Sequence, residues 1–146
     1  MSKGNDTNEK KAARCATIQS GRLRTWSAHL HEPAPARSGR VHTRRGVEIE
    51  ITLDNGNVGR GDISPLAGLH RESLEEAIAG AEATFGQLRG LEVEACGTEG
   101  LHHLTPSKAV TEIVDERLLK IPSASWGMTC AILEATGAFE VTPESA

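Results

Sequence analysis

Residues 44–76 read RRGVEIEITLDNGNVGRGDISPLAGLHRESLEE, and this stretch decides the fold. From Val47 to Leu53, apolar residues alternate with Glu and Thr, which is the period of two of a half-buried strand. Asn55-Gly56 then predicts a tight hairpin turn, because both residue types tolerate the positive φ of a type I′ turn. We expect the returning strand at Val58 to Ile63.

The length of this turn decides which face of the hairpin each residue occupies. A two-residue loop places Arg60 and Asp62 on the apolar face, opposite Ile51 and Ile49. Charges in that position must snorkel at the rim of the sheet or meet a partner surface. A longer turn exchanges the two faces. The two-residue register is our expectation.

The chain before the hairpin divides into a tail, a strand and a loop. Residues 1–20 are assigned to a disordered tail, which starts as the polar sequence MSKGNDTNEKKAAR. Residues 23–31, LRTWSAHLH, alternate and predict a first strand. Residues 32–40 contain two prolines and a glycine, so a loop is expected between that strand and the hairpin.

Helical patterns fill the second half of the chain. After a Pro/Gly loop at residues 64–69, apolar residues recur at helical spacing from Leu74 to Phe85, behind a Ser73/Glu76 capping box and before Gly86. The segment LEVEAC (91–96) is left open between a helical extension and an edge strand. Thr105-Pro106 opens a second helix, and residues 122–135 form a third that is apolar all round and therefore expected to be buried.

Three strands followed by three helices predict an α+β domain, a three-stranded antiparallel meander followed by a three-helix bundle. A net charge of −4 and 3% aromatic residues give nucleic-acid binding little support. No apolar run approaches a membrane span, and a cytoplasmic location is expected. The three widely spaced cysteines and the two histidine pairs lack metal-ligand spacing, so no metal site is predicted.

Several separated motifs resemble the N-terminal capping domain of the enolase superfamily, in particular its o-succinylbenzoate synthase and N-acylamino acid racemase branch. The segment VGRGDISPLAG (58–68) is similar to the family's G-x-G-E-x-x-P-L-P-G, and residues 72–77 to the helix after it. Residues 122–134 resemble the family's P-S-x-x-x-x-x-x-x-A-L-x-D/E helix. Asp62, Ala67 and Arg60 depart from the pattern at positions where the family usually has Glu, Pro and an aromatic residue.

The resemblance implies a domain at residues 21–140, followed at 141–146 by the start of a linker to a (β/α) barrel. In such enzymes a Lys of the barrel removes a proton beside a carboxylate, and Mg²⁺ held by three acidic residues stabilises the enediolate. The five lysines of this sequence do not form the Lys-x-Lys element typical of the branch. No catalytic residue, metal ligand or bound cofactor is therefore expected here, and Mg²⁺ is implied only for the intact enzyme.

What the resemblance implies for these residues is a lid of two loops, residues 35–42 and 64–69, which close the barrel mouth around a small carboxylate substrate. The candidate capping residues are Arg37, Ser38, Gly39, Arg40, Pro65, Leu66, Gly68 and Leu69. The implied partner is a barrel domain in cis or in trans, with neither nucleic acid nor membrane. The alternatives are ordinary surface loops, or a free-standing module for ligand or protein binding that reuses the capping fold.

Overall fold

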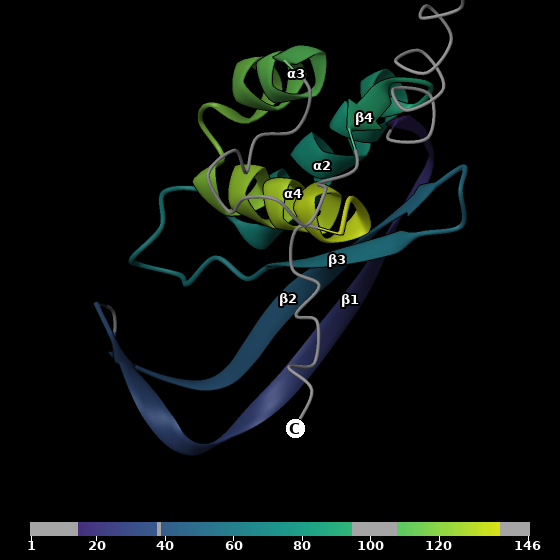
Figure 1. Ribbon diagram of the computed structural model, residues 1–146. Coiled ribbons are helices and arrows are strands. Elements are labelled where there is room, and N and C mark those ends of the chain that lie inside the picture. Colours follow the sequence, from purple (N-terminus) through teal and green to yellow (C-terminus); the bar gives the residue numbers. More distant parts are fainter. Residues whose placement is uncertain (1–14, 38, 95–107, 138–146) are drawn as a thin grey trace, which may run out of the picture.

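The computed structural model describes residues 15–37, 39–94 and 108–137 (Figure 1). The elements in chain order are β1 (Cys15–Ala36), β2 (Gly39–Leu53), β3 (Val58–Ile63), α2 (Leu74–Leu88), β4 (Glu92–Glu94), α3 (Lys108–Leu118) and α4 (Pro122–Ala135). The strands form one antiparallel sheet in the order β3-β2-β1-β4, and the helices cover one of its faces. The α+β class and the β1-β2-β3 meander are confirmed.

The β2–β3 turn is longer than the sequence analysis expected. The Leu53 N–H donates to the carbonyl of Asn57 at 2.9 Å, and the Gly56 N–H donates to the carbonyl of Leu53 at 3.0 Å. The loop therefore has three residues and ends on Gly56, whose φ is 88°. This geometry matches the three-residue hairpin in which a type I turn is followed by a left-handed glycine. The predicted two-residue register is wrong.

The observed register reverses the two faces of β3. Ile49 and Ile51 lie opposite Gly61 and Gly59, and all charged side chains of β3 point to the face away from the helices. There Arg60 pairs with Glu50 at 3.0 Å, and the indole N–H of Trp26 donates to Asp62 at 2.7 Å. Arg60 and Asp62 therefore need neither to snorkel nor to be buried, because the longer turn keeps both in a hydrogen-bonded, solvent-facing network.

The two glycines of β3 let α4 lie directly against the strand. A Cβ built on Gly59 would overlap the carbonyl oxygen of Ala131, and one on Gly61 would overlap that of Gly127. The missing side chains thus form a smooth stripe on which the helix backbone rests. Most of the buried core lies between this sheet face and the helices, and its largest members are Ile18, Val47, Ile49, Ile51, Leu53, Ile63, Leu88, Leu118, Met128 and Ile132.

The first strand extends beyond the expected residues in both directions. Residues 15–20, assigned to the tail, belong to β1, where Ala16 and Ile18 are buried and Cys15–Thr17 pairs with β4. The open segment 91–96 thus contains an edge strand. The loop predicted at residues 32–40 is wrong, since β1 and β2 stay paired as far as Ala36 and Gly39, with an irregularity between His29 and Ala34. Prolines are tolerated here because, within the part of the chain that the structure describes, no third strand pairs with the outer edges of this two-stranded arm.

The helix signals are mostly confirmed. Ser73 and Glu76 form the predicted capping box, and α4 begins at Pro122. The helix end predicted at Gly86 is wrong, because α2 runs on to Leu88 and the glycine with positive φ is Gly90. α4 is not buried all round: Trp126 is 71% exposed. The predicted opening of the second helix at Thr105-Pro106 lies outside the described residues.

The glycine stripe yields a test of the register. We expect Gly61→Ala to destabilise the domain by about 2 kcal/mol or more, because the added methyl must push α4 away from β3. Gly86→Ala is the matched control, since nothing lies near its Cβ position within the exposed face of α2. It should stabilise by about 0.5–1 kcal/mol through helix propensity. Urea unfolding of both variants measures this, and equal effects would contradict the observed seat of α4.

Candidate functional site

Two segments that are far apart in the sequence meet at one end of the sheet. The tip of the β1–β2 hairpin contributes Pro35, Ala36 and Arg37, and the β3–α2 loop contributes Leu66, Gly68 and Leu69. Together they line an open cavity of about 540 Å³, which we call the lid notch. In Figure 1 the hairpin tip and the β3–α2 loop lie at the same end of the molecule. Four of the predicted capping residues, Arg37, Leu66, Gly68 and Leu69, are therefore brought together.

The remaining predicted residues lie around the notch or outside the described chain. Gly39, with φ of 127°, helps the hairpin to turn, and Arg40 follows it as an exposed residue of β2. Neither lines the notch. Pro65 lines a neighbouring cavity of about 250 Å³ between the loop, α2 and residues 41–45 of β2. Ser38 lies outside the described residues.

Glycine is required where the two segments touch. Gly68 has a φ of 83°, and a Cβ at this position would lie 3.2 Å from the Cβ of Arg37. A side chain would therefore be strained by its own backbone and crowded by the hairpin tip. The close approach keeps the guanidinium-bearing Arg37 beside the apolar Leu66 and Leu69.

The β3–α2 loop is held in part by His70, a residue that was not among the predicted capping residues. The N–H of Leu66 donates to Nδ1 of His70 at 2.9 Å, and the N–H of His70 donates to the carbonyl of Leu66 at 3.0 Å. Arg44 adds a third tie, because its guanidinium donates to the Ser64 carbonyl at 2.9 Å. The only sequence signal for His70 is its position between a Pro/Gly loop and a capping box.

Glu72 fixes the end of the same loop to the start of α4. Its carboxylate accepts from the Ser123 N–H at 3.0 Å, and the residue is only 7% exposed. Burial by itself raises the pKa of the Glu72 carboxyl, but the hydrogen bonds from Ser123, one from its own backbone and the nearby His70 lower that pKa below the ordinary value. A helix N-terminus that lacks its own side-chain cap is thus capped from a distant loop.

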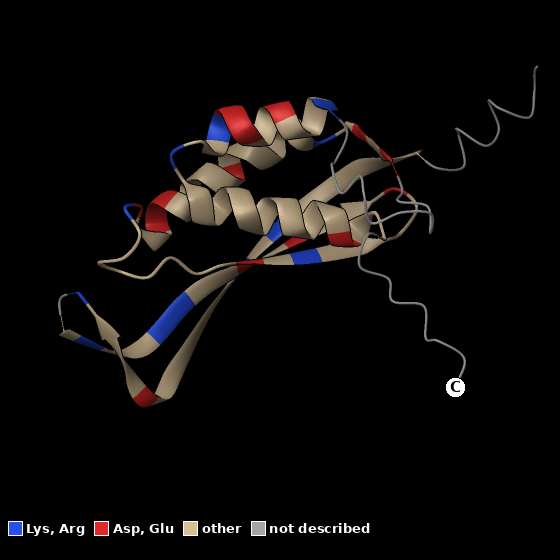
Figure 2. Cartoon of the chain, turned by 60° about the vertical axis from the view of Figure 1, so that its left-hand side comes forward, with Lys and Arg blue, Asp and Glu red and all other residues tan. Residues whose placement is uncertain are grey.

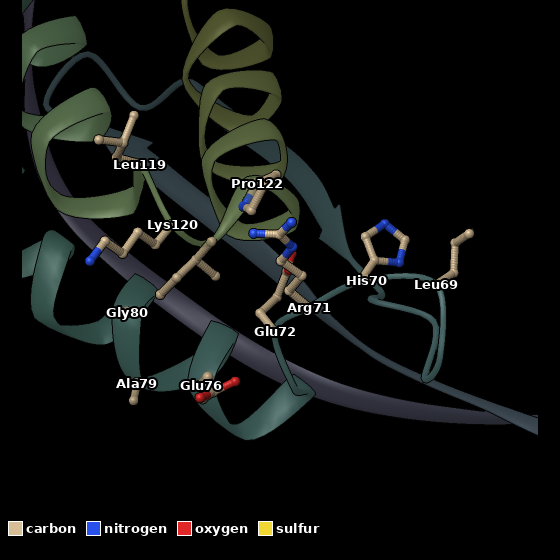
Figure 3. A pocket seen from close by; sticks show the side chains of 11 residues that line it. Leu69, His70, Arg71, Glu72, Glu76, Ala79, Gly80, Leu119, Lys120 and Pro122 are labelled. Carbon is tan, nitrogen blue, oxygen red and sulfur yellow. The ribbon is translucent and has the colours of Figure 1, made fainter. Parts of the chain in front are cut away.

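A larger open groove of about 1080 Å³ lies beside the lid notch, and Figure 3 shows the side chains that line this groove. Leu69 lines both cavities. The groove runs between α2 and the α3–α4 connection, and its lining combines acidic, basic and apolar side chains. These include His70, Arg71, Glu72, Glu76, Lys120, Leu119, Ile121 and Pro122. Leu69 and Leu119 are 74% and 76% exposed, so this side of the molecule presents uncovered apolar surface.

The chemistry of the notch is that of a binding surface. A cation beside two leucines suits a ligand with an anionic group next to an apolar part. Within residues 15–37, 39–94 and 108–137, no three His, Cys, Asp or Glu side chains are placed to hold a metal ion. None of the helices in the described part of the chain is long and apolar enough to cross a membrane.

The Glu72 tie has a pH-dependent contribution to stability. Because folding lowers the pKa of this carboxyl, its stabilisation is complete above the ordinary value of 4.5 and is lost as the pH falls through the lowered pKa. We expect Glu72→Ala to cost about 1–3 kcal/mol at neutral pH. Urea unfolding at several pH values should show the gap to wild type closing in acid. The exposed neighbour Glu75 is the control, and a Glu75→Ala loss as large as that of Glu72→Ala would refute the assignment.

Comparison with known proteins supports the resemblance. No family model matches the chain. Over 130 residues it is 28% identical to the curated o-succinylbenzoate synthase of Citrobacter koseri, a match that spans 88% of this chain and 32% of that protein. The chain therefore corresponds to about a third of the length of that relative.

Solved structures share the fold. A mandelate racemase/muconate lactonizing protein from Herpetosiphon aurantiacus superposes with a TM-score of 0.66 at 21% identity, covering 82% of this chain and 30% of that one. The L-Ala-D/L-Glu epimerase of Bacillus subtilis gives 0.63 at 20%, covering 79% and 29%. The dipeptide epimerase of Cytophaga hutchinsonii, solved with Mg and D-Ala-L-Val, gives 0.63 at 18%, covering 80% and 28%. The chain thus shares the fold of one part of these enzymes and spans about 30% of their length.

Proposed function

We propose that this chain is the substrate-capping part of an o-succinylbenzoate synthase-like enzyme and acts with a (β/α) barrel, in cis or in trans. The observation that carries the proposal is the lid notch, in which Arg37 from one segment meets Leu66 and Leu69 from another. Two loops that converge at one end of a rigid sheet are suited to cover an active site. The match to about a third of an o-succinylbenzoate synthase supports the same role.

The residues of the notch would act on the part of the substrate remote from the chemistry. Arg37 offers a planar cation that can pair with a carboxylate, and its neighbours Leu66 and Leu69 offer apolar surface that a bound barrel and substrate would cover. The substrate would thereby be held in one orientation and shielded from water, since binding energy far from the reacting bond is used to hold it in place. In the intact enzyme, Mg²⁺ would stabilise the enediolate from the barrel side.

Two reactions fit a lid of this kind. The leading one is dehydration of a cyclohexadiene carboxylate in menaquinone synthesis, as the similarity to o-succinylbenzoate synthase implies. The neighbouring one is epimerisation of dipeptides or acyl amino acids, because structural neighbours include dipeptide epimerases. Both substrates carry a carboxylate beside a less polar group, which is the pattern that Arg37 and the two leucines match.

Charge on the hairpin supports an acidic partner or substrate. Residues 27–45, the β1–β2 arm, contain four arginines and one glutamate, which is net +3 in a chain of net −4. In Figure 2 the distal part of this arm shows mainly blue segments and reaches away from the helices. Among the described residues, no third strand pairs with the arm, and a two-stranded hairpin alone is marginally stable. An acidic surface would stabilise it.

Complementation tests the proposal. The chain is co-expressed with a barrel domain of an o-succinylbenzoate synthase that lacks its own cap, and co-elution and lyase activity are measured. We expect restored activity, and about a tenfold or greater loss with Leu66→Asp because a charge enters the notch. Leu119→Asp is the matched control at an exposed leucine outside the notch. A chain that ignores the barrels of both synthases and epimerases would favour an independent binding module.

The arm should make this association salt-dependent. Replacing Arg37 and Arg40 by Glu reverses charge at the tip, so we expect weaker co-elution with the barrel and a flatter dependence of affinity on salt. The pair Arg22 and Arg24 provides the control, because both arginines are already paired with Glu50 and Glu48 on the same sheet. Titration calorimetry between low and high salt measures the difference. Equal slopes for the two double variants would rule out the arm as the docking element.

A further inference from the structure

The shape of the β3–α2 loop depends on one imidazole. His70 makes two hydrogen bonds to Leu66. Its ring Nδ1 accepts from the Leu66 backbone N–H at 2.9 Å, and its backbone N–H donates to the Leu66 carbonyl at 3.0 Å. The Leu69 N–H donates to the same carbonyl at 3.0 Å, and Ala67 forms a bridge with His70. The loop is therefore closed mainly by its own residues, with the side chain of Leu66 left to line the notch.

The grip requires one protonation state. To accept from a backbone N–H, Nδ1 must carry a lone pair, so the imidazole is neutral with its proton on Nε2. An imidazolium donates from both nitrogens and would oppose the Leu66 N–H. The charged side chains that share the groove with this ring are Arg71, Glu72, Glu76 and Lys120. They carry two charges of each sign, and among them the Glu72 carboxylate attracts the protonated ring, since a charged His70 lowers the pKa of that carboxyl.

The backbone at His70 is anchored to two helices, so a broken bond to the ring affects the loop residues before it. Two residues after His70, the buried carboxylate of Glu72 is tied to the N–H of Ser123 at the start of α4. Ser73 then begins the capping box of α2. The backbone of residues 70–73 is thus held by two helices, whereas residues 66–69 are half-buried or exposed. If the bond to Nδ1 breaks, Leu66 loses the tie on its amide and keeps those on its carbonyl, so residues 66–69 rather than residues 70–73 are the part that shifts.

We propose that His70 is a positioning residue that sets Leu66 in the lid notch while its imidazole is neutral, and that protonation loosens the β3–α2 loop at residues 66–69, which we call the lid loop. The hydrogen bond between His70 and Leu66 is a property of the chain alone. The consequence for catalysis rests on the proposed capping function. In an intact enzyme, the release would weaken closure over the substrate on acidification without altering any group that performs the reaction.

Hydrogen exchange at the Leu66 amide tests whether the Leu66–His70 bond depends on the protonation of the ring. In the purified chain, we expect its protection, corrected for intrinsic exchange, to fall by about tenfold between pH 8 and pH 5, because an imidazolium no longer accepts from the Leu66 N–H. His70→Ala should show the low protection at both pH values. His70→Asn should keep the high protection at both, because its side-chain oxygen takes the place of Nδ1 and does not titrate in this range. The Glu76 amide, which donates to the Ser73 hydroxyl, is the internal control.

The outcomes separate this proposal from the capping function. Leu66 protection that does not change with pH in the wild type, or that is lost equally in the His70→Asn and His70→Ala variants, overturns the role of His70 even where complementation succeeds. If exchange behaves as expected, and the complemented wild-type enzyme loses activity in acid while the His70→Asn variant keeps it, both proposals stand. If the exchange results are as expected but no barrel is complemented, the role of His70 in the loop is supported and the capping role is refuted.

Discussion

The seating of α4 on the bare backbone of β3 is the contact on which the rest of the molecule depends. It requires Gly59 and Gly61 on the inner face, and this follows from a three-residue turn between β2 and β3. The same turn sends Arg60 and Asp62 to the outer face, where both find partners. With α4 in place, the N–H of Ser123 meets the carboxylate of Glu72, and the lid loop acquires a fixed end. One turn residue thus links the core to the candidate site.

The sequence predicted the elements of the sheet better than their pairing. Alternation identified residues 47–53 and 58–63, since a half-buried strand must repeat with a period of two. The register failed because Asp54-Asn55-Gly56 contains the signals of both a two-residue and a three-residue loop. The two loop lengths differ in the free-energy cost of facing Arg60 toward the core. That cost depends on tertiary packing, which a local sequence pattern does not report. The prolines of residues 32–40 misled in a similar way, because an arm with unpaired edges tolerates them.

The candidate site was predictable to the extent that it rests on local chemistry. The resemblance to the capping domains pointed to Arg37, Leu66, Gly68 and Leu69, and the fold brings these four together. His70 and Glu72 were missed as ties of the loop because their partners are a backbone amide four residues back and one 51 residues ahead. A side chain that accepts from a distant amide leaves no periodic pattern in the sequence, so only the folded chain reveals it.

The proposed capping role rests on two parts of the chain, the β1–β2 arm and the β3–α2 loop. The sheet and helices share a buried core, whereas the two strands of the β1–β2 arm pair only with each other among the described residues, and the arm carries net positive charge. A domain that acted alone would gain stability by covering such an arm, because a two-stranded ribbon in water is marginal. Keeping it uncovered is useful if its partner supplies the cover. The β3–α2 loop is built in the same way on a smaller scale: Glu72 anchors its end, while the amide of Leu66 is held by one imidazole nitrogen. Firm anchors with weakly held tips allow a lid to open without unfolding the domain that carries it.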